Sequence, residues 1–425
     1  MTPTGWNVAV KSPHDDVLIL GGGAIGLAIA LALLEAGRGV HVIDAAAAGG
    51  GASHGNCGTI TPSHAPPLAA PGVVAQALRW MFTPDAPLYL KPRVDPVLWH
   101  WLLRFAARCN ARDWRTSTQA RSALLNDARP RLADWVERYR LACEFEEEGL
   151  DYVFRDPRKF QQYVDEAAVL AEFGIATEVF DGAAYERDEP AMLPGVTGAI
   201  RFPGDARLRP DRYVAELARV VRERGGLIEE QCRVDRLDTT KTGVRLTTSQ
   251  GTREGRDAVI ALGAWTPAFA RTLGLKAPIQ PGKGYSITYS RPALVPRRPM
   301  VLKDRSVCVT VWDSGFRLGS TMEFSGHDDT LNETRLSALE RGAREFLREP
   351  VGAEVHERWC GWRPMTWDDL PLLGRAPHHE HVWLAAGHGM LGISMSSATG
   401  QLMADLMTGR TPAFDPTPYR PERFV

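Results

Sequence analysis

The sequence of 425 residues lacks an excess of one charge, paired cysteines and a long apolar run. A net charge of −1 argues against nucleic acid as a partner, because a phosphate backbone requires a basic face. The six cysteines are scattered with no C-x-x-C pair, which indicates a reducing compartment and no structural zinc. No apolar stretch is long enough to span a membrane.

Other absences concern the start of the chain and catalysis. Residues 1–15 lack the basic and apolar regions of a signal peptide, so we expect an irregular terminus and a cytoplasmic protein. The histidines show no metal-ligand spacing, and no Ser-His-Asp or Cys-His arrangement stands out. The sequence therefore predicts no metal site and offers no evident nucleophile.

What the sequence does have is a glycine-rich turn between two apolar strands at residues 17–44. An apolar run at 17–20 precedes a helical stretch, and a second apolar run at 39–43 ends at Asp44. Between the first run and the helix lie the glycines of a G-x-G-x-x-G motif: Gly21, Gly23 and Gly26. This order predicts the first βαβ unit of a dinucleotide-binding fold.

Each part of this unit has a physical role. Gly21 permits a tight turn, Gly23 lets the backbone approach a pyrophosphate, and Gly26 lets the helix pack on the strand. The pyrophosphate would lie on the helix N-terminus, and Asp44 would accept hydrogen bonds from a ribose hydroxyl. The alanines at 45–48 leave no place for a 2′-phosphate. The motif itself does not distinguish NAD from FAD.

The length favours two lobes, and the pattern of segments interleaves them in the sequence. The predicted fold class is α/β, with a parallel Rossmann-like lobe and a second, substrate-binding lobe built on an antiparallel sheet plus helices. A predicted strand at 257–262, closed by Gly263, returns the chain to the parallel sheet. The expected division is 15–70, 205–275 and 375–415 for the dinucleotide-binding lobe, and 71–204 and 276–374 for the substrate lobe.

Strands and helices are predicted from short apolar runs and from 3.6-residue periodicity. The predicted strands are 144–149, 151–156, 176–180, 198–202, 232–237, 244–248, 285–289, 307–312 and 316–321. The predicted helices are 157–173, 213–224 and 333–347.

A long segment rich in glycine, proline and serine follows Asp44 and covers residues 45–72. It is too long to be a simple connection, and its position after the second strand places it beside the dinucleotide. Ser53 and Asn56 are candidate hydrogen-bonding partners for the ligand. The alternative is an ordinary solvated loop.

Residues 73–139 have helical periodicity, with an apolar face predicted at Trp99, Leu102, Leu103 and Ala106. Aromatic and basic side chains alternate here, and two interpretations stay open: a surface facing a membrane or a quinone, or amphipathic helices packed on a sheet. The residues concerned are Trp80, Phe82, Tyr89, Trp99, Trp101 and Phe105 with Arg79, Lys91, Arg93, Arg104 and Arg108.

Two segments near the C-terminus carry further signals. Residues 381–407 form a strand, a glycine-rich turn and a helix, and such a helix N-terminus can stabilise negative charge near flavin N1. A capped helix that docks the chain end is the alternative. In the segment 359–374, Arg363 lies among aromatic residues, Gly and Pro, where its guanidinium could hold a substrate carboxylate. An ion pair with Asp368 or Asp369 is the other interpretation of Arg363.

Together these motifs resemble the superfamily of D-amino acid oxidase-like flavoproteins, and within it the D-amino acid dehydrogenase (small subunit) family. The relevant stretches are GGGAIGLAIALALLEAGRGVHVID, GNCGTITP, RWMFTPDAPLYLKPRVDP, PGKGYSIT, GWRPMTWDDLPLLG and GHGMLGISMSSATGQ. The resemblance implies bound FAD. The cofactor-binding residues that it and the motifs indicate are Gly21, Gly23, Ala24, Ile25, Gly26, Asp44, Ser53, Asn56, Val234, Gly263, Gly389, Met390, Leu391 and Gly392.

The resemblance also implies an activity. Arg363 matches the arginine that binds the substrate carboxylate in the superfamily, and Tyr285 is a looser candidate for the same pocket. The implied reaction is oxidation of a D-amino acid, or of a cyclic D-imino acid such as D-proline or cis-4-hydroxy-D-proline, with a quinone as electron acceptor. His388 is expected either near the flavin or at the surface. Cys360 is one residue out of register with the flavin-linked cysteine of sarcosine oxidases, so non-covalent FAD is expected.

Two other functions fit the same resemblance. One is an oxidase of glycine or sarcosine type that uses oxygen, and the other is an FAD-bound subunit of a hetero-oligomeric dehydrogenase. Peripheral contact with the inner face of the membrane and homo-oligomer formation are also compatible with the sequence.

Overall fold

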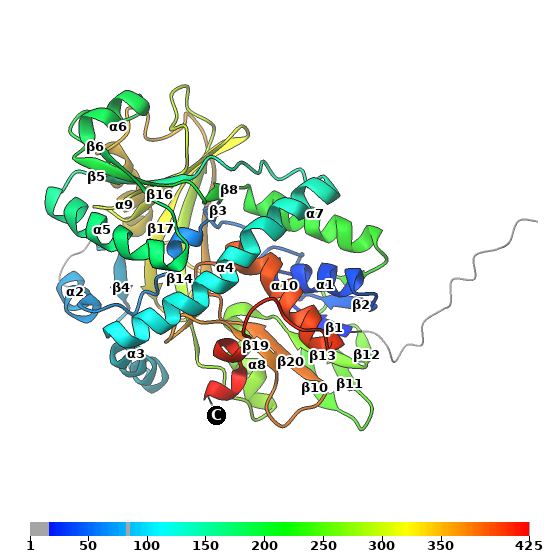
Figure 1. The fold of residues 1–425 in the computed structure, drawn as a ribbon. Coiled ribbons are helices and arrows are strands. Elements are labelled where there is room, and N and C mark those ends of the chain that lie inside the picture. Colours follow the sequence, from blue (N-terminus) through cyan, green and yellow to red (C-terminus); the bar gives the residue numbers. More distant parts are fainter. Residues whose placement is uncertain (1–16, 82–85, 425) are drawn as a thin grey trace, which may run out of the picture.

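The computed structural model describes residues 17–81 and 86–424, and Figure 1 shows two sheets that are joined by long helices. The expected irregular terminus at 1–15 and Phe82 lie outside the described residues. In the described part, no helix has the length and apolar character that a bilayer crossing needs.

The first sheet is the predicted dinucleotide-binding sheet. Its strand order is β19-β20-β13-β1-β2-β9, parallel throughout except for β19 at the edge. The chain enters this sheet three times, so the prediction that the two lobes are interleaved is correct. The strands are β1 (Val17–Leu20), β2 (Val40–Ile43), β9 (Leu227–Glu229), β13 (Asp257–Ile260), β19 (Leu372–Arg375) and β20 (Val382–Ala386). The proposed lobe boundaries themselves stay a prediction.

Alternate side chains of β1 enter two different cores. Val17 and Ile19 pack against the helices on one face of the sheet, whereas Leu18 and Leu20 pack toward a small three-stranded sheet on the other face. Because both faces are covered, the strand is apolar at every position. The helices are α1 (Ala24–Glu35), α7 (Pro210–Glu223), α10 (Gly392–Thr408) and, packed on α10, α4 (Ala111–Tyr139). The small sheet is β10 (Val234–Thr239), β11 (Val244–Thr248) and β12 (Gly251–Gly255).

The second sheet is large and mostly antiparallel, as predicted, with the order β18-β14-β17-β16-β15-β5-β7-β6 and with β4 beside β17. Helix α9 (Glu333–Arg344) packs against β14, β16 and β17. Its strands are β4 (Leu88–Leu90), β5 (Leu150–Phe154), β6 (Glu178–Asp181), β7 (Gly198–Phe202), β14 (Ile279–Tyr289), β15 (Met300–Leu302), β16 (Val307–Trp312), β17 (Gly315–Phe324) and β18 (Val355–Thr366). The predicted strand at 144–149 is wrong, because only Glu146 forms a bridge there, with Arg207.

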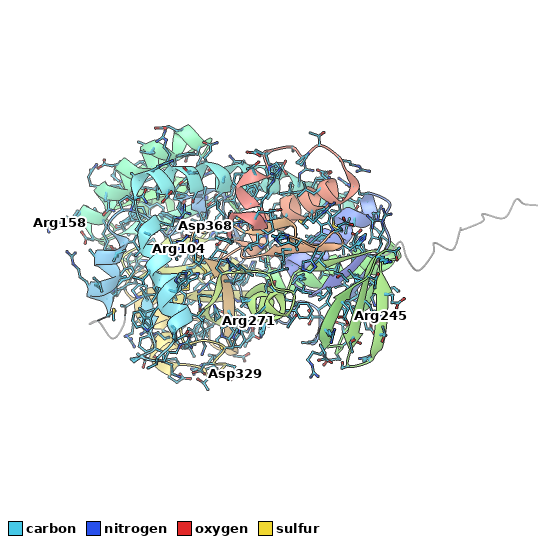
Figure 2. All side chains as sticks on the ribbon, turned by 90° about the horizontal axis from the view of Figure 1, so that it is seen from below. Arg104, Arg158, Arg245, Arg271, Asp329 and Asp368 are labelled. Carbon is cyan, nitrogen blue, oxygen red and sulfur yellow. The ribbon has the colours of Figure 1, made fainter. Side chains whose placement is uncertain are left out.

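The remaining elements lie around these two sheets. Figure 2 shows Arg158, on α5, and Arg245, on β11, at opposite ends of the molecule. These elements are α2 (Val73–Trp80), α3 (Pro96–Arg108), α5 (Pro157–Leu170), α6 (Gly182–Asp188), α8 (Thr266–Thr272), the short strands β3 (Thr59–Ile60) and β8 (Ala206–Arg207), and the 3-10 turn η2 (Pro62–His64).

The predicted apolar face of α3 is correct only in part, because Leu102 packs against the core but Trp99 and Leu103 do not. The helix buries Leu98 and Trp101, whereas Trp99 is 53% exposed and Leu103 is 71% exposed. The Trp101 indole donates a hydrogen bond to the carbonyl of Pro278 (3.1 Å), and its ring stacks on Phe105. A buried indole N–H needs such a partner, and apolar residues surround most of this helix, so periodicity alone did not identify the inward face.

A buried carboxyl fixes the segment that precedes α2. Asp205 is 1% exposed and accepts hydrogen bonds from the Ser63 hydroxyl and from the Ser63 backbone N–H (3.1 Å). Burial raises the pKa of Asp205 to about 7, although the two bonds from Ser63 oppose the shift. In the folded protein the Asp205 carboxyl is therefore protonated over a pH range in which it is ionised in the unfolded chain.

This shift predicts a pH dependence of stability. Because the folded state holds a proton that the unfolded state releases, the stabilising effect is complete below the ordinary pKa near 4 and is lost as pH rises to about 7. We expect the thermal unfolding midpoint of Asp205→Asn to fall less between pH 5 and 8 than that of the wild type. Identical pH profiles for the two proteins would show that Asp205 titrates normally.

Candidate functional site

A cavity of about 2300 Å³ runs between the two sheets. It is lined by Gly21 and Asp44 at one end, by Arg363 from the antiparallel sheet, and by α2 and α3 at the other end. Single small-molecule pockets usually measure about 300–1000 Å³, so this cavity has room for a large ligand and a small one together.

The three glycines of the motif meet different surroundings. A side chain at Gly21, where φ is +107°, would lie 2.5 Å from the carbonyl oxygen of Ala261, so the turn requires glycine. A side chain at Gly26 would lie 1.9 Å from the carbonyl oxygen of Gly21, because helix and strand are in contact there. Beside Gly23 the nearest atom is the Ser53 hydroxyl at 3.6 Å, which leaves this backbone open to a ligand. The turn predicted at Gly21 and the close packing predicted at Gly26 are therefore observed.

Asp44 follows directly after β2 and lines the cavity. Its carboxylate accepts hydrogen bonds from the backbone N–H groups of Gly22 (2.6 Å) and Ala46 (2.8 Å). Burial raises the pKa of Asp44, and these two bonds oppose the shift. Since each carboxylate oxygen has a second lone pair, Asp44 can accept ribose hydroxyl groups as well. The Ser53 hydroxyl accepts a hydrogen bond from the N–H of Ala24 in the first turn of α1 (3.2 Å).

Two helices begin at the wall of the same cavity. Neither the N-cap residue of α1, Gly23, nor that of α10, Leu391, supplies a side-chain cap. The turn before α10 contains Gly387 and Gly389 with φ of +85° and +56°, and the residues from Gly389 to Ile393 line the cavity. Apart from the Ala24 N–H, which donates to Ser53, the N–H groups at these helix N-termini favour negative charge. The cavity therefore has two separate places that suit an anionic or electron-rich group.

Arg363 extends from β18 across the neighbouring strand β14. Its guanidinium lies over Gly284, where any side chain would come within 2.3 Å of Nη1. Nη1 donates a hydrogen bond to the carbonyl of Thr321 on β17 (2.6 Å), and Nη2 is 3.5 Å from the carbonyl of Ser320. Burial lowers the pKa of this guanidinium, which nevertheless stays charged.

The carbonyls that hold Arg363 come from an irregular part of β17. The pairing of β14 with β17 shifts register between Lys283 and Tyr285, so the strand bulges there. Thr321 has a φ of +63°, which is costly for a β-branched residue, and its buried hydroxyl has no partner among the described residues. Bulges of this kind free carbonyls from the sheet ladder. Here the bulge directs them at the guanidinium of Arg363.

Arg363 forms no ion pair with a described acid. Asp368 pairs with Arg423 (2.9 Å), and Asp369 lies 3.7 Å from Arg121. The interpretation of Arg363 as one half of an ion pair with either aspartate is therefore wrong, because both carboxylates have other partners. The neutral carbonyls orient the guanidinium and leave its charge uncompensated at the cavity.

Tyr285 touches the cavity but its hydroxyl points elsewhere. It donates a hydrogen bond to Glu323 (2.9 Å), and the side chain is 1% exposed. Because side chains alternate along a strand, Tyr285 lies on the face of β14 opposite to the one that Gly284 presents to Arg363. Burial raises the pKa of Tyr285. The geometry favours a supporting role for Tyr285 and not contact with a substrate through its hydroxyl.

His388 is 4% exposed and lines the cavity, so the alternative that placed it at the surface is wrong. Its Nε2 lies 3.1 Å from the Thr399 hydroxyl, and burial lowers its pKa to about 3, which keeps the ring neutral. Cys360 is not among the residues that line the cavity, and its thiol donates to the carbonyl of Asp329. The expectation that FAD is bound without a covalent link to Cys360 stays a prediction.

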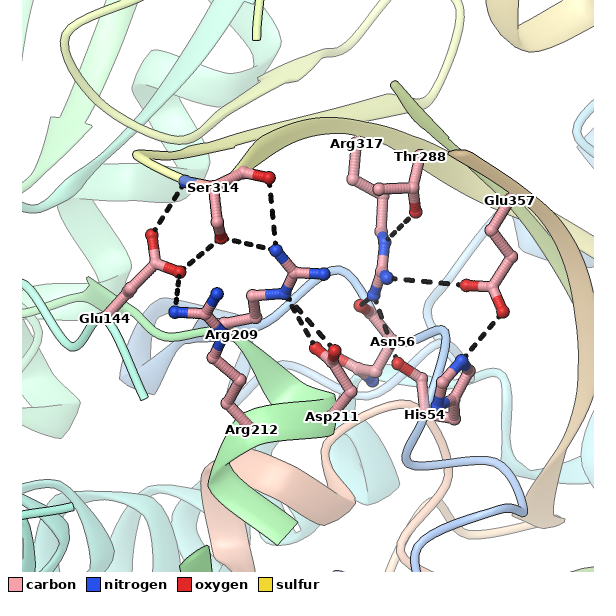
Figure 3. Close-up of polar contacts among 10 residues, drawn as sticks. All are labelled: His54, Asn56, Glu144, Arg209, Asp211, Arg212, Thr288, Ser314, Arg317 and Glu357. Carbon is pink, nitrogen blue, oxygen red and sulfur yellow. Dashed lines mark hydrogen bonds and ion pairs between the residues drawn. The ribbon is translucent and has the colours of Figure 1, made fainter. Parts of the chain in front are cut away.

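The loop after β2 is anchored to the antiparallel sheet and is not freely solvated. Figure 3 shows Arg317 between this loop and the acid Glu357, with Nη1 donating to the carbonyls of His54 (3.2 Å) and Asn56 (2.7 Å). The Asn56 side chain accepts a hydrogen bond from the N–H of Gly58 (2.8 Å). Glu357 also pairs with the His54 ring (2.8 Å), which raises the pKa of His54.

All residues that we expected to contact the cofactor line the cavity, except Gly26, which packs the helix on the strand. Those that line it are Gly21, Gly23, Ala24, Ile25, Asp44, Ser53, Asn56, Val234, Gly263, Gly389, Met390, Leu391 and Gly392. Sequence reasoning missed other lining residues with polar side chains: Cys57, Thr61, His64, Lys303, Cys308 and Trp362. Cys57 and Thr61 lie in the GNCGTITP stretch and Trp362 in GWRPMTWDDLPLLG, but neither pattern shows which side chains face the cavity, and His64, Lys303 and Cys308 lie outside the quoted stretches.

The cavity suits a dinucleotide. Besides the open helix ends, it contains buried polar atoms that have no partner among the described residues: Thr61 Oγ1, His64 Nδ1, Thr321 Oγ1 and Trp362 Nε1. Such atoms cost free energy unless a bound molecule or water satisfies them. An elongated ligand with a phosphate near Gly23, a ribose near Asp44 and a ring near Gly389 would use both ends of the site.

Comparison with known proteins agrees with a dinucleotide as the ligand of this cavity. The family model described as FAD dependent oxidoreductase (DAO) matches residues 16–406. A D-amino acid dehydrogenase of Methylobacterium nodulans is 34% identical over 408 residues, covering 93% of this chain and 96% of that protein. A D-amino acid dehydrogenase of Granulibacter bethesdensis is 31% identical over 407 residues, covering 94% of this chain and 97% of that protein.

Solved structures share the fold. Glycine oxidase from Geobacillus kaustophilus superposes with a TM-score of 0.76 at 24% identity, covering 96% of this chain and 99% of that one. L-proline dehydrogenase from P. horikoshii superposes with a TM-score of 0.72 at 18% identity, covering 97% of this chain and 98% of that one.

The geometry of Asp44 leads to a prediction about FAD retention. Asp44→Ala is expected to weaken FAD binding by about 1.5–3 kcal/mol, because a charge-assisted hydrogen bond to the ribose is lost. Equilibrium dialysis of FAD against the two apoproteins measures the change. Asp238→Ala, which removes a carboxylate paired with Arg236 on β10, is the matched control and is expected to retain FAD normally.

Two outcomes would contradict this account of the cofactor. Unchanged FAD affinity in Asp44→Ala would mean that the carboxylate does not contact the ribose. After acid precipitation of the wild type, the yellow colour is expected in the supernatant, and colour in the pellet would reveal a covalent link.

Proposed function

The chain belongs to the DAO family of FAD-dependent oxidoreductases, and on that basis we propose that it is a dehydrogenase of D-amino acids or cyclic D-imino acids. The observation that carries the proposal is the uncompensated guanidinium of Arg363, held over the cavity by two backbone carbonyls. A charge placed in this way recognises a carboxylate, which every amino acid substrate carries.

Arg363 fixes one end of the substrate. Two parallel hydrogen bonds from its planar fork would hold the carboxylate, and the bulge in β17 prevents the guanidinium from following it. Orientation of this kind supplies a large part of catalysis, because a substrate held in position needs no further entropy loss to react.

The proposed reaction requires no general base from the protein. Bound FAD supplies the hydride acceptor. If the substrate nitrogen is uncharged, its lone pair assists departure of hydride from the α-carbon, and no strong general base is required. The two histidines that line the cavity, His64 and His388, both have their pKa lowered to about 3 by burial, so neither would act as a base near neutral pH.

The substrate class rests on the relatives. The curated proteins that cover nearly the whole chain are D-amino acid dehydrogenases, which supports D stereochemistry and a non-oxygen acceptor. We include cyclic D-imino acids, such as D-proline and cis-4-hydroxy-D-proline, because the sequence resembles relatives that prefer them.

Arg363→Ala tests the assignment directly. Loss of the guanidinium leaves a desolvated carboxylate unpaired, which costs about 3–5 kcal/mol and lowers kcat/KM roughly a hundred- to thousandfold. Arg363→Lys is expected to recover only part of this loss, because an ammonium does not reproduce the fork. Anaerobic bleaching of the flavin by a panel of D- and L-amino acids measures the effect and identifies the substrate.

Two further variants separate substrate binding from stability. Arg358→Ala removes a partly exposed arginine of the same strand, paired with Glu333, and is expected to react at the wild-type rate. Gly284→Ala places a methyl group against the Arg363 guanidinium and should raise KM while FAD content stays normal. Normal flavin reduction in Arg363→Ala would refute the proposed carboxylate site.

We propose that the electron acceptor reaches the cavity between α2 and α3. Five apolar side chains of these helices and their ends are exposed and also line the cavity; we call them the apolar rim: Val74, Leu78, Met81, Trp99 and Leu103. A quinone or the edge of a bilayer would cover such side chains favourably. Peripheral membrane contact through this rim therefore accompanies the proposal.

Most basic residues of this region have partners, so they offer less free positive charge to a membrane than the sequence indicated. Lys91 pairs with Asp328 (2.8 Å), Arg93 with Asp95 (2.6 Å) and Arg108 with Asp113 (3.3 Å). Arg104 lies over the ring of Trp367. We therefore expect any contact with a bilayer to depend on apolar insertion more than on salt.

The apolar rim leads to a prediction. Burying a leucine is worth about 1.5–3 kcal/mol, so Leu78→Asp and Leu103→Asp should each lower co-sedimentation with phospholipid vesicles about tenfold. Turnover with a long-chain quinone analogue should fall in parallel, whereas turnover with a water-soluble dye should not. Val179→Asp, at an exposed position on β6, is the matched control.

The acceptor assay also distinguishes the function classes. Wild-type turnover is expected to be fast with dye or quinone and slow with oxygen. Equal turnover with oxygen would make the protein an oxidase, and activity that appears only with a partner would make it a subunit of a larger dehydrogenase. Vesicle binding that is equal in all variants would exclude the rim as the contact surface.

A further inference from the structure

Two thiols lie side by side next to the guanidinium of Arg363. Cys308 on β16 pairs across the sheet with Gly319 on β17. Cys57, from the loop after β2, fills the space that glycine leaves, since a side chain at Gly319 would lie 2.5 Å from the Cys57 sulfur. Cross-strand β-carbons are about 4.5–5.5 Å apart, so the two sulfurs are neighbours. Both cysteines line the cavity.

The two thiols differ electrostatically. The adjacent Cys308 thiol, and then the positive charges of Arg363 and Arg317, lower the pKa of Cys57, although burial opposes the shift. The neighbouring sulfur and burial raise the pKa of Cys308, which therefore keeps its proton. One thiol is thus prepared to react as the nucleophile, and a second, protonated thiol lies beside it.

The loop that carries Cys57 is held in place. Arg317 is 1% exposed; its Nη1 binds two carbonyls of the loop, and its Nε donates to the Thr288 hydroxyl (2.8 Å), as Figure 3 shows. The Ser286 hydroxyl donates to the carbonyl of Gly55 (2.9 Å). These contacts fix the backbone on the N-terminal side of Cys57, so the distance between the two thiols is set by the fold.

We propose that Cys57 and Cys308 form a reversible disulfide under peroxide stress and that this bond closes the carboxylate site at Arg363. The Cys57 thiolate attacks hydrogen peroxide, an S–O bond forms, the O–O bond breaks and hydroxide leaves as water after protonation. The Cys308 sulfur then attacks the Cys57 sulfur, an S–S bond forms, the S–O bond breaks and a second water leaves with the Cys308 proton. The two thiols lose two electrons, and the peroxide gains them.

The bond would change the substrate pocket by moving the Cys57 side of its wall. A disulfide draws the two sulfurs to bonding distance and ties the loop after β2 to β16, so that the cavity wall beside Arg363 shifts toward the sheet. Access of a carboxylate to Arg363 should then fall, while the distant contacts around Asp44 keep FAD in place. This inference rests on the proposed carboxylate site at Arg363 but not on which amino acid is the substrate, and the joined peptide is detected whether or not that site is correct.

Peroxide treatment of the holoenzyme, followed by alkylation of free thiols and mass spectrometry, tests the proposal. We expect a peptide pair joined through Cys57 and Cys308 that is lighter than the two free peptides by about 2 Da, and dithiothreitol should separate the pair. Activity of the same sample should fall about tenfold in kcat/KM and return with dithiothreitol, while FAD content stays constant.

Cys57→Ser and Cys308→Ser, each compared with its own untreated sample, should lose the joined peptide and the part of the inactivation that dithiothreitol reverses. Cys360→Ser is the matched control, because this half-buried thiol of the same sheet lies outside the cavity, and it should behave as the wild type. Absence of the joined peptide in the wild type, or a disulfide that leaves kcat/KM unchanged, would overturn the proposal.

Discussion

The site depends on one uncompensated charge. Arg363 is held by neutral carbonyls of Thr321 and Ser320, and no described acid pairs with it. A guanidinium in this position is costly in the free protein, because burial disfavours its charge and no carboxylate of the described residues lies opposite to offset that cost. A bound carboxylate would recover this cost, which is why we propose the arrangement as a recognition site for a substrate carboxylate and not as a structural contact.

Each of the two sheets positions a different part of the site. The parallel sheet directs the N-termini of α1 and α10 at the cavity and so provides for the cofactor, while the antiparallel sheet supplies the floor on which Arg363 lies. The loop after β2 joins the two, since it lines the cofactor side and is fastened by Arg317 to the other sheet. The placement of Cys57 beside Arg363 is a consequence of that fastening.

The sequence predicted what local patterns determine and missed what long-range contacts determine. The first βαβ unit, Asp44 and the turn before α10 follow from strand, glycine and helix signals within a few dozen residues. By contrast, β18 was not predicted, because its run of charged, aromatic and glycine residues has no simple alternation. The inward face of α3 depends on a bond from Trp101 to a distant carbonyl, and the cysteine pair depends on register between β16 and β17. Neither leaves a periodic signal.

The central claim is that Arg363 recognises the substrate carboxylate. The most direct test is to measure binding of a carboxylate that cannot be oxidised, such as pyrrole-2-carboxylate, with the change in flavin absorbance as the signal. The account predicts saturable binding to the wild type and to Arg358→Ala with the same Kd. In Arg363→Ala the Kd should rise about a hundredfold or more, because the guanidinium supplies the charge-assisted bonds. An equal Kd in Arg363→Ala and the wild type would contradict the account, since the carboxylate would then be recognised elsewhere.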